Sequence, residues 1–330
     1  MTPKPKKRQP AKPPGTFWRK PAGRVAAGLA VLAVLGVGIG LLFTAPPEAP
    51  APQTLARVTL EKTVQRPPEP PEPERTKPIS RDPGARLPET QAWLKNAVAA
   101  AAPDGRPMIA VVIDDVGLDR PRSRRAIALP APLTIALMAY AEDGRDQAAH
   151  VRRAGHELLV HIPMEPTNRS ENPGPNALLS GLPPAEFARR IEWNLSQFAG
   201  YVGVNNHMGS KLTSDPAALA PIMAALKRRG LMFLDSRTSS ETQALAVARR
   251  FGVPAVERNV FLDHDISPIA VRAALVQVEE VAQRQGFAIA IGHPKDVTLE
   301  ALEEWLPDVK ARGFAVVPLT AILRYGAGEG

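Results

Sequence analysis

The sequence from about residue 90 onward predicts an α/β domain built as an irregular (β/α) barrel. Short apolar runs without clear polar alternation recur along this part of the chain, which is typical of strands buried on both faces of a parallel sheet. Each run is followed by a segment with the periodicity of an amphipathic helix. Seven or eight such units in roughly 230 residues suit a closed barrel better than an open sheet.

A basic tail precedes everything else. Residues 1–24 contain eight Lys and Arg residues and no acidic residue, which equals the net charge of +8 of the whole chain. The rest of the chain is therefore formally neutral, and we expect no nucleic-acid partner. The chain contains no cysteine, which excludes disulfides, thiolate zinc ligands and a cysteine nucleophile.

The next segment is apolar, with the sequence VAAGLAVLAVLGVGIGLLF at residues 25–43. It carries no charge and, at about 1.5 Å per residue, nearly spans a ~30 Å hydrocarbon core. We predict a single transmembrane anchor over residues 25–44 of the inner (cytoplasmic) membrane, with the basic tail in the cytoplasm and the C-terminal domain periplasmic or extracytoplasmic. A cleaved signal peptide is the alternative, although its apolar region is usually only about 7–15 residues long.

A proline-rich linker is predicted over residues 45–90. Twelve prolines lie between residues 45 and 88. Proline lacks an amide donor and favours an extended backbone, so this segment cannot build a core and is expected to be a disordered spacer. The domain then covers residues 91–330.

Within the domain, eight apolar runs are predicted strands, at 108–113, 133–138, 157–162, 201–205, 231–234, 254–257, 287–292 and 314–317. Helices with clear signals lie between several of them. Asp215 can cap a helix that starts at Pro216 and ends at Gly230. Another helix starts at Ser267–Pro268, and apolar stripes mark two more at Phe187–Phe198 and Leu299–Leu306.

Polar and ionisable residues follow most of these runs, where α/β folds place their active sites. Four of the six histidines are among the polar residues at these positions. In chain order, the polar residues that follow the apolar runs are Asp114 and Asp115, His161 and Glu165, Asn206 and His207, Asp235 and Ser236, Asp263–His264–Asp265, and His293. Individual positions also have simpler explanations: Asp235 and Ser236 can cap a helix, Asp263–His264–Asp265 can form a solvated turn, and His156 can be a turn residue or a core contact.

Two adjacent carboxylates at the end of a buried strand repel each other, and a divalent cation would remove that cost. Catalytic zinc typically has three protein ligands, which Asp115, His161 and His207 would supply as one oxygen and two nitrogens. Asp114 could then act as a general base and His293 could protonate a leaving group. The set predicts metal-assisted hydrolysis of an amide or ester, with zinc as the expected ion.

The same residues resemble motifs of the polysaccharide deacetylases, the NodB homology family. VVIDDVG resembles the first motif, whose paired aspartates serve as base and metal ligand, and AGHELLVHIPMEP resembles the second, which carries metal-binding histidines. VNNHMGS and LDS fall at the third and fourth motifs, and AIAIGH resembles the last, which supplies the catalytic histidine. The resemblance covers about residues 105–320, is closest to the divergent branch of envelope proteins, and implies a distorted (β/α)7 barrel acting on an acetylated glycan.

The chain departs from the family pattern at two positions. The second histidine of the second motif is Glu165 here, and Asn205–Asn206–His207 stand where the third motif has an arginine. The third metal ligand could therefore be His207 or Glu165, and Glu165 could instead cap a helix or orient His161.

Two functions remain open at this point. The first is a membrane-anchored, metal-dependent hydrolase that removes acetyl groups from peptidoglycan or another envelope glycan. The second is a catalytically inactive barrel that binds glycan or regulates an envelope process; the altered third motif favours it, whereas the presence of Asp114, Asp115 and His293 favours the enzyme.

Overall fold

The computed structural model describes residues 91–130 and 132–326. The predicted basic tail, transmembrane anchor and linker lie outside these residues. Among the helices within the described ranges, none is long and apolar enough to cross a membrane.

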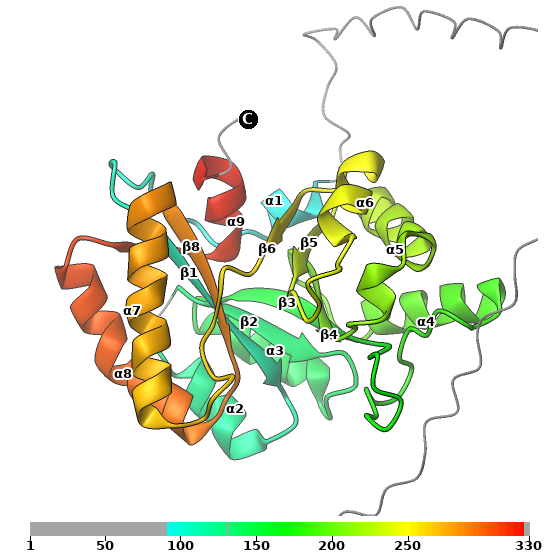
Figure 1. The fold of residues 1–330 in the computed structure, drawn as a ribbon, viewed down its shortest axis with the longest axis horizontal. Helices are drawn as coiled ribbons and strands as arrows, with labels where there is room; N and C mark the ends of the chain where they lie inside the picture. Colours follow the sequence, from blue (N-terminus) through cyan, green and yellow to red (C-terminus); the bar gives the residue numbers. More distant parts are fainter. Residues whose placement is uncertain (1–90, 131, 327–330) are drawn as a thin grey trace, which may run out of the picture. The chain divides into compact units, whose positions relative to one another are not determined.

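The described chain forms one parallel sheet with helices on its outside (Figure 1). Neighbouring strands follow the order β6-β5-β4-β3-β2-β1-β8-β7, and β9 pairs with the start of β1. The strands are β1 Met108–Val116, β2 Thr134–Met138, β3 Glu157–Met164, β4 Gly203–Met208, β5 Met232–Asp235, β6 Ala255–Glu257, β7 Val260–Phe261, β8 Phe287–Gly292 and β9 Ala315–Val316. The predicted parallel α/β architecture is confirmed, and each predicted strand has a counterpart within two residues of its start.

The sheet is curled rather than evenly closed. Its two edge strands, β6 and β7, are consecutive in the chain and are separated only by Arg258 and Asn259. So short a link holds the two edges close together, because each residue spans at most about 3.6 Å. The link is bonded to both sides: the backbone N–H of Arg258 donates to Asp235 of β5, and that of Asn259 donates to Ile289 of β8. If β6 and β7 are taken as one broken strand, the chain from β1 to α8 forms seven strand–helix units, and the short pair β9 and α9 follows them.

The helices that connect the strands cover the outer face. Figure 1 shows α7 beside β8 with α8 on the other side of α7, and α6 packs against β5 and β6 with α5 beside it. Their bounds are α1 Ala92–Lys95, α2 Arg120–Ile127, α3 Gly144–Arg153, α4 Pro184–Ser196, α5 Pro216–Arg229, α6 Ala244–Phe251, α7 Pro268–Gln285, α8 Asp296–Ala311 and α9 Leu319–Ala321, with a short 3-10 turn at Leu212–Ser214 and a π turn at Ile322–Gly326. The predicted caps are confirmed: Asp215 accepts from the N–H groups of Ala217 and Ala218, and Ser267 accepts from that of Ala270.

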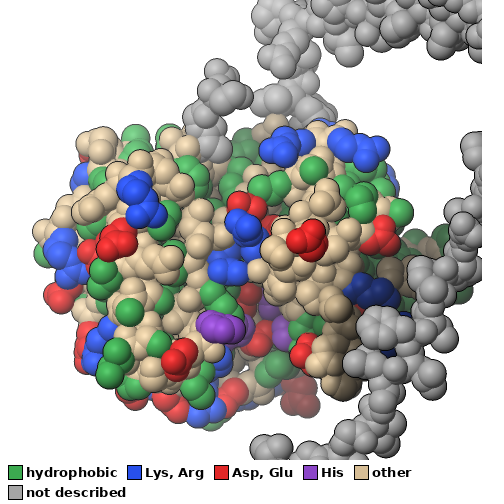
Figure 2. Space-filling view, viewed as in Figure 1, with side chains coloured by type: hydrophobic (Ala, Val, Ile, Leu, Met, Phe, Trp, Pro, Cys, Tyr) green, Lys and Arg blue, Asp and Glu red, His purple; other side chains and the backbone are tan. Residues whose placement is uncertain are grey.

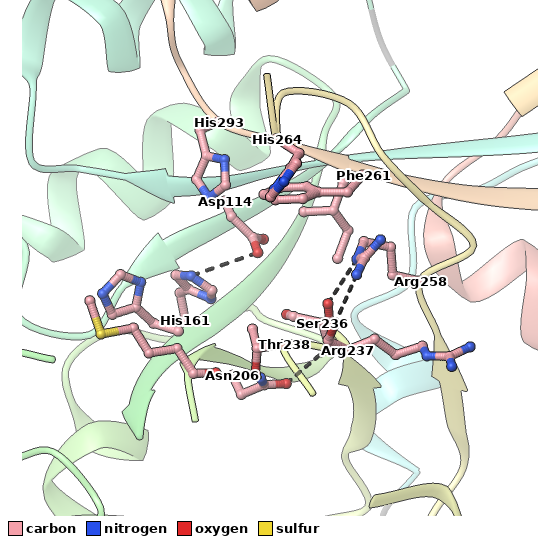
Figure 3. A pocket seen from close by; sticks show the side chains of 13 residues that line it. Asp114, His161, Asn206, Ser236, Arg237, Thr238, Arg258, Phe261, His264 and His293 are labelled. Atoms are coloured by element: carbon pink, nitrogen blue, oxygen red, sulfur yellow. Dashed lines mark hydrogen bonds and ion pairs between the residues drawn. The ribbon is translucent and has the colours of Figure 1, made fainter. Parts of the chain in front are cut away.

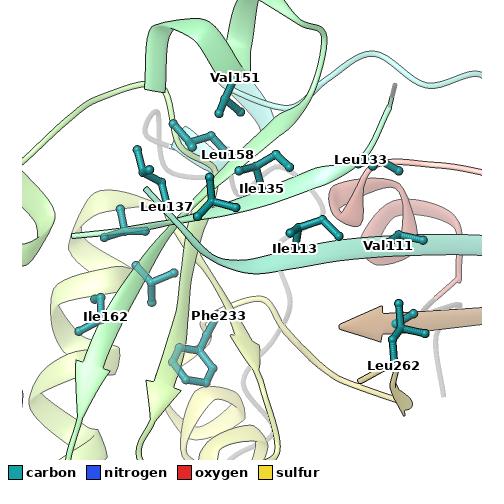
Figure 4. Close-up of a cluster of buried hydrophobic side chains, with 14 of the residues drawn as sticks. Val111, Ile113, Leu133, Ile135, Leu137, Val151, Leu158, Ile162, Phe233 and Leu262 are labelled. Atoms are coloured by element: carbon teal, nitrogen blue, oxygen red, sulfur yellow. The ribbon is translucent and has the colours of Figure 1, made fainter. Parts of the chain in front are cut away.

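Two apolar layers lie on opposite faces of the sheet. The outer layer, between strands and helices, includes Ile113, Ile135, Leu158, Ile162 and Phe233 (Figure 4). The inner layer alternates with it along the strands and is joined by Leu319, Ala321 and Ile322 of the C-terminal segment. That segment lies against the amino ends of β2 and β3, where Leu319 and Thr320 bond to Thr134 and Glu157. The amino end of the interior is thereby filled, whereas the carboxyl end is left for polar side chains.

Candidate active site

Polar side chains continue the inner-face pattern at the carboxyl ends of four strands. Side chains on a strand alternate between faces, so a residue two positions after an inner-layer residue points to the same side. On β1, β3, β5 and β8 the inner-layer residues are Val112, Leu159, Leu234 and Ile291. The residues two positions later are Asp114, His161, Ser236 and His293, and all four line one cavity.

Asp115 reaches this cluster because β1 is irregular at its end. On a regular strand, Asp115 would point away from Asp114. Instead, the pairing of β1 with β2 shifts register between Ile113 and Val116, and Asp115 has a left-handed backbone with φ of 57°. The bulge turns the second carboxylate toward His161 and His207. Both carboxylates therefore serve the same site.

Asp115, His161 and His207 form a compact set of possible metal ligands. Oδ1 of Asp115 lies 3.2 Å from Nε2 of His161 and 2.8 Å from Nδ1 of His207, and one ligating atom from each residue lies within 4.8 Å of the others. Oδ1 of Asp115 is buried and makes no hydrogen bond of good geometry to the described residues. A buried oxygen left in this way, beside two imidazole nitrogens, fits a divalent cation such as zinc.

A buried network fixes the orientation of His161. Nδ2 of Asn205 donates to Oδ1 of Asp114 at 2.8 Å, so the amide oxygen of Asn205 faces Nδ1 of His161, also at 2.8 Å. An amide oxygen only accepts hydrogen bonds, so Nδ1 of His161 carries the proton. Nε2, the nitrogen that faces Asp115, is then free to bind a metal when the ring is neutral.

His293 is held by a second carboxylate, that of Asp263. Oδ1 of Asp263 lies 2.9 Å from Nδ1 of His293, and Oδ2 accepts from the backbone N–H of His293 and from the hydroxyl of Thr298, each at 2.8 Å. Nε2 of His293 consequently faces the cluster, 3.7 Å from Oδ2 of Asp115. The imidazole is placed for proton transfer at the cavity.

The surroundings shift the pKa values of the two adjacent carboxyl groups in opposite directions. Burial raises the pKa of Asp114, although His161 and His293 oppose the shift. Burial would also raise the pKa of Asp115, but the imidazoles of His161 and His207 hold that pKa well below its usual range. Asp115 is therefore suited to remain an anion and Asp114 to accept a proton.

The two inward-facing histidines gain proton affinity. Burial alone would lower the pKa of His161, but the carboxylates of Asp114 and Asp115 raise it to about 9. Burial likewise acts to lower the pKa of His293, and Asp263 outweighs it and raises that pKa. His293 thus favours its protonated form, as a general acid must.

The cluster opens into a cavity of about 340 Å³. Figure 2 shows histidine side chains in a hollow of this face, with Lys and Arg side chains beside them. Figure 3 shows Asp114, His161 and His293 on one side of the cavity, and Ser236, Thr238 and Arg258 on the other. The space therefore has a titratable side and a cationic side.

Three further residues predicted for the site lie outside the Asp115–His161–His207 set. Glu165 accepts hydrogen bonds from the backbone N–H and the hydroxyl of Ser180 and forms an ion pair with Lys211 at 2.6 Å. It therefore links two loops. Asn206 lines the cavity and accepts from the N–H of Ser236 at 2.9 Å. Asp235 is buried, and its carboxylate accepts from Thr242 and from the N–H of Arg237; it does not cap α6, which begins after Gln243.

The sequence predicts no specific site role for Asn205, Asp263 or Arg258. Asn205 belongs to the stretch Asn205–Asn206–His207 that stands in place of the missing arginine, but only Asn206 and His207 of that stretch are predicted site residues. Asp263 follows a predicted strand, and Asp263–His264–Asp265 could have been either site residues or a solvated turn. In the structure Asp263 is buried, whereas His264 and Asp265 are exposed. No motif marks Arg258 in the sequence, because no local pattern indicates that the chain passes there from one edge strand of the sheet, β6, to the other, β7. His156, the other uncertain histidine, is a core residue.

This chain is similar in sequence to a known protein family and to uncharacterised bacterial proteins. The family model described as divergent polysaccharide deacetylase matches residues 111–323. The uncharacterised protein YibQ of Escherichia coli K12 is 34% identical over 205 residues, which cover 61% of this chain and 64% of YibQ. An uncharacterised protein of Haemophilus influenzae is 32% identical over 200 residues, 60% of this chain and 70% of that protein.

A solved structure has the same fold. The crystal structure of the uncharacterised protein ATU2773 from Agrobacterium tumefaciens C58 is 28% identical, with a TM-score of 0.67, and the match covers 70% of this chain and 94% of that one. The match of the family model takes in both aspartates of β1, the histidines of β3 and β4, and His293. This chain therefore belongs to the divergent polysaccharide deacetylase family.

Proposed function

We propose that this protein is a metal-dependent hydrolase that removes acetyl groups from an envelope glycan. The observation that carries the proposal is the placement of three possible metal ligands, Asp115, His161 and His207, between two residues suited to proton transfer, Asp114 and His293. Family membership supports a glycan substrate, with peptidoglycan as one source.

In this proposal Asp115, His161 and His207 would hold a divalent ion, with zinc the expected metal. That ion would polarise the acyl carbonyl and lower the pKa of the attacking water. Asp114 accepts a proton from the attacking water, helped by a pKa that burial raises. Nε2 of His293 gives a proton to the departing amine or alcohol, while Asp263 fixes the ring from Nδ1.

The proposal is tested by acetate release from acetylated glycans. The full-length chain, purified in mild detergent and loaded with zinc, is expected to release acetate from chitooligosaccharides or peptidoglycan fragments, and Asp114→Asn and His293→Ala are expected to lose at least about 100-fold of that rate. The exposed His150→Ala serves as the matched control. Zinc binding without acetate release from any of these glycans would contradict the enzyme.

That contradicting result would favour the second function, an inactive barrel that binds glycan or regulates an envelope process. One observation points to it: Asn205–Asn206–His207 stand where the family's third motif has an arginine, and Asn205 donates a hydrogen bond to Asp114, the proposed base. Glycan binding that persists in the chain without turnover would support this alternative.

We also propose that residues 25–44 anchor the protein in the cytoplasmic membrane with the domain outside the cytoplasm. The uncharged apolar segment and its basic flank support this topology. In spheroplasts, external protease is expected to degrade the domain while the N-terminal tail survives. Protection of the domain in intact spheroplasts, with degradation only after lysis, would contradict it.

A further inference from the structure

Among the residues that the structure describes, Arg258 lies in the cavity with no carboxylate at ion-pair distance. It lies in the link between β6 and β7, it lines the cavity, and its side chain is half-buried. None of the ion pairs among residues 91–130 and 132–326 includes it. Its neighbour Arg237, in contrast, pairs with Glu257 at 3.1 Å.

The guanidinium of Arg258 is held in a fixed position. Nε donates to the carbonyl oxygen of Ser236 at 2.8 Å, and Nη2 donates to that of Arg237 at 2.9 Å (Figure 3). A guanidinium has five N–H donors, so most of them are left for another partner. Two carbonyl groups fix its position but do not neutralise its charge.

Phe261 relates this cation to the proposed reaction centre. The Cζ atom of Arg258 lies 5.1 Å from the centre of the Phe261 ring, and the His293 ring lies 5.5 Å from the same point. The guanidinium and the proposed acid are therefore separated by no more than these two distances combined, which one or two linked sugar residues can span. One glycan segment can reach both groups.

We propose that the cavity selects a glycan that carries a carboxylate, on the acetylated sugar or on the adjacent one, and that Arg258 binds this carboxylate. The inference deepens the proposed function and rests on it, since it names the substrate class of the same site. It is carried by an unpaired, fixed guanidinium next to the reaction centre.

The energetic argument is that a half-buried charge without a counter-ion is costly. A carboxylate would accept the remaining N–H donors and offset that cost, whereas a neutral sugar would leave the cation as it is. Burial and the nearby charge of Arg237 lower the pKa of Arg258, and the charges of Asp235, Asp114 and Glu257 offset this only in part. A charge-assisted hydrogen bond of this kind corresponds to roughly tenfold or more in affinity.

The test measures binding without turnover. Full-length, zinc-loaded Asp114→Asn is titrated by calorimetry with three disaccharides: neutral diacetylchitobiose, N-acetylglucosaminyl-N-acetylmuramic acid, whose carboxylate is on a lactyl ether, and the hyaluronan disaccharide, whose carboxylate is on a uronic acid. At least one acidic disaccharide is expected to bind about tenfold or more tightly than diacetylchitobiose. The two acidic sugars distinguish which carboxylate position is recognised.

Variants of Arg258 identify the group responsible. Adding Arg258→Gln is expected to abolish the preference for the acidic sugar and leave the affinity for diacetylchitobiose nearly unchanged, and Arg258→Lys is expected to restore part of the preference. Arg237→Gln, which removes a cation already paired with Glu257, is the control and should keep the preference.

Three outcomes would overturn the inference: equal affinity for acidic and neutral disaccharides, no measurable binding of either acid, or equal losses in Arg258→Gln and Arg237→Gln. Acetate release by the unmodified chain is measured separately. Turnover without acidic preference would reject the role of Arg258 alone, whereas acidic preference without turnover would reject the hydrolase alone.

Discussion

Asp263 binds His293 through two hydrogen bonds: its Oδ1 lies 2.9 Å from the imidazole Nδ1, and its Oδ2 accepts from the backbone N–H of the same residue at 2.8 Å. Such a carboxylate sets both the tautomer and the direction of the ring. Asp263 touches no part of the cavity itself, so it is a positioning residue for the proposed acid.

Asp263→Asn is expected to reduce acetate release about 10–100-fold, because the ring of His293 loses its charged partner. The readout that separates positioning from folding is the ¹⁵N NMR signal of His293 Nδ1, which should lose the signature of a proton shared with a carboxylate. Asp265→Asn, an exposed neighbour that can still accept from Ser267, is the control. Unchanged NMR signals in Asp263→Asn would refute the role.

The choice between His207 and Glu165 as third metal ligand can be settled by metal content. His207→Ala is expected to weaken zinc binding at least about 100-fold, since it removes one of three converging ligands. Glu165→Gln should bind zinc normally, because its carboxylate is engaged by Ser180 and Lys211. Competition with a chromogenic chelator measures both affinities, and zinc lost only in Glu165→Gln would reverse the assignment.

Gly203 is expected to tolerate no side chain. A Cβ atom there would meet the carbonyl oxygen of Met232 at 2.3 Å, in the core of β4 and β5. Gly203→Ala should therefore reduce the free energy of unfolding by about 2 kcal/mol or more, through overpacking that the backbone cannot relieve. Gly181→Ala, where a Cβ would meet nothing within 4 Å, is the control, and urea denaturation of both variants is the measurement. Equal midpoints for the two variants would disprove the clash.

His156 gives the folded state a dependence on pH. Its Nδ1 accepts from the N–H of Leu133 at 3.1 Å, so Nε2 donates to the carbonyl of Ile127 at 2.9 Å and the ring is neutral. Burial lowers the pKa of His156 below its usual 6.5, so the folded state binds fewer protons than the unfolded state. The stability that this group contributes is complete above about pH 6.5 and is lost as the pH falls below that value.

The corresponding measurement compares urea midpoints at pH 7.5 and 5.5. His156→Gln, whose amide can accept from Leu133 and donate to Ile127, should show a smaller drop between the two pH values than the parent chain. His150→Gln, at an exposed position, should behave like the parent. A drop of the same size in all three proteins would assign the pH dependence to other groups.

The sequence predicts this fold well where local signals are strong. Long apolar runs such as β1 and β3 and capped helices such as α5 and α7 agree with prediction because burial and caps are local properties. Helices α2, α3 and α6 were not identified, because they are only 8–10 residues long and an apolar stripe repeats too few times in so short a segment. The two-residue strand β7 has no periodicity to detect.

For the site, strand ends indicate which residues gather at one edge, but not which of them contact each other. The left-handed backbone of Asp115 is a result of the shifted register between β1 and β2, which is a tertiary effect. The bonds of Asn205 to Asp114 and of Asp263 to His293 join residues 91 and 30 positions apart. No local pattern specifies such partners.

The short link between β6 and β7 limits which sequence changes this protein can tolerate in the course of evolution. The link brings the two sheet edges together, and it and the adjoining strand β7 place Arg258 and Phe261 in the cavity wall. Insertions, which surface loops usually tolerate, would here separate the edges and displace the cavity wall at once. Substrate preference in such a protein can therefore diversify by exchange of side chains in this stretch, whereas its length is constrained by the architecture.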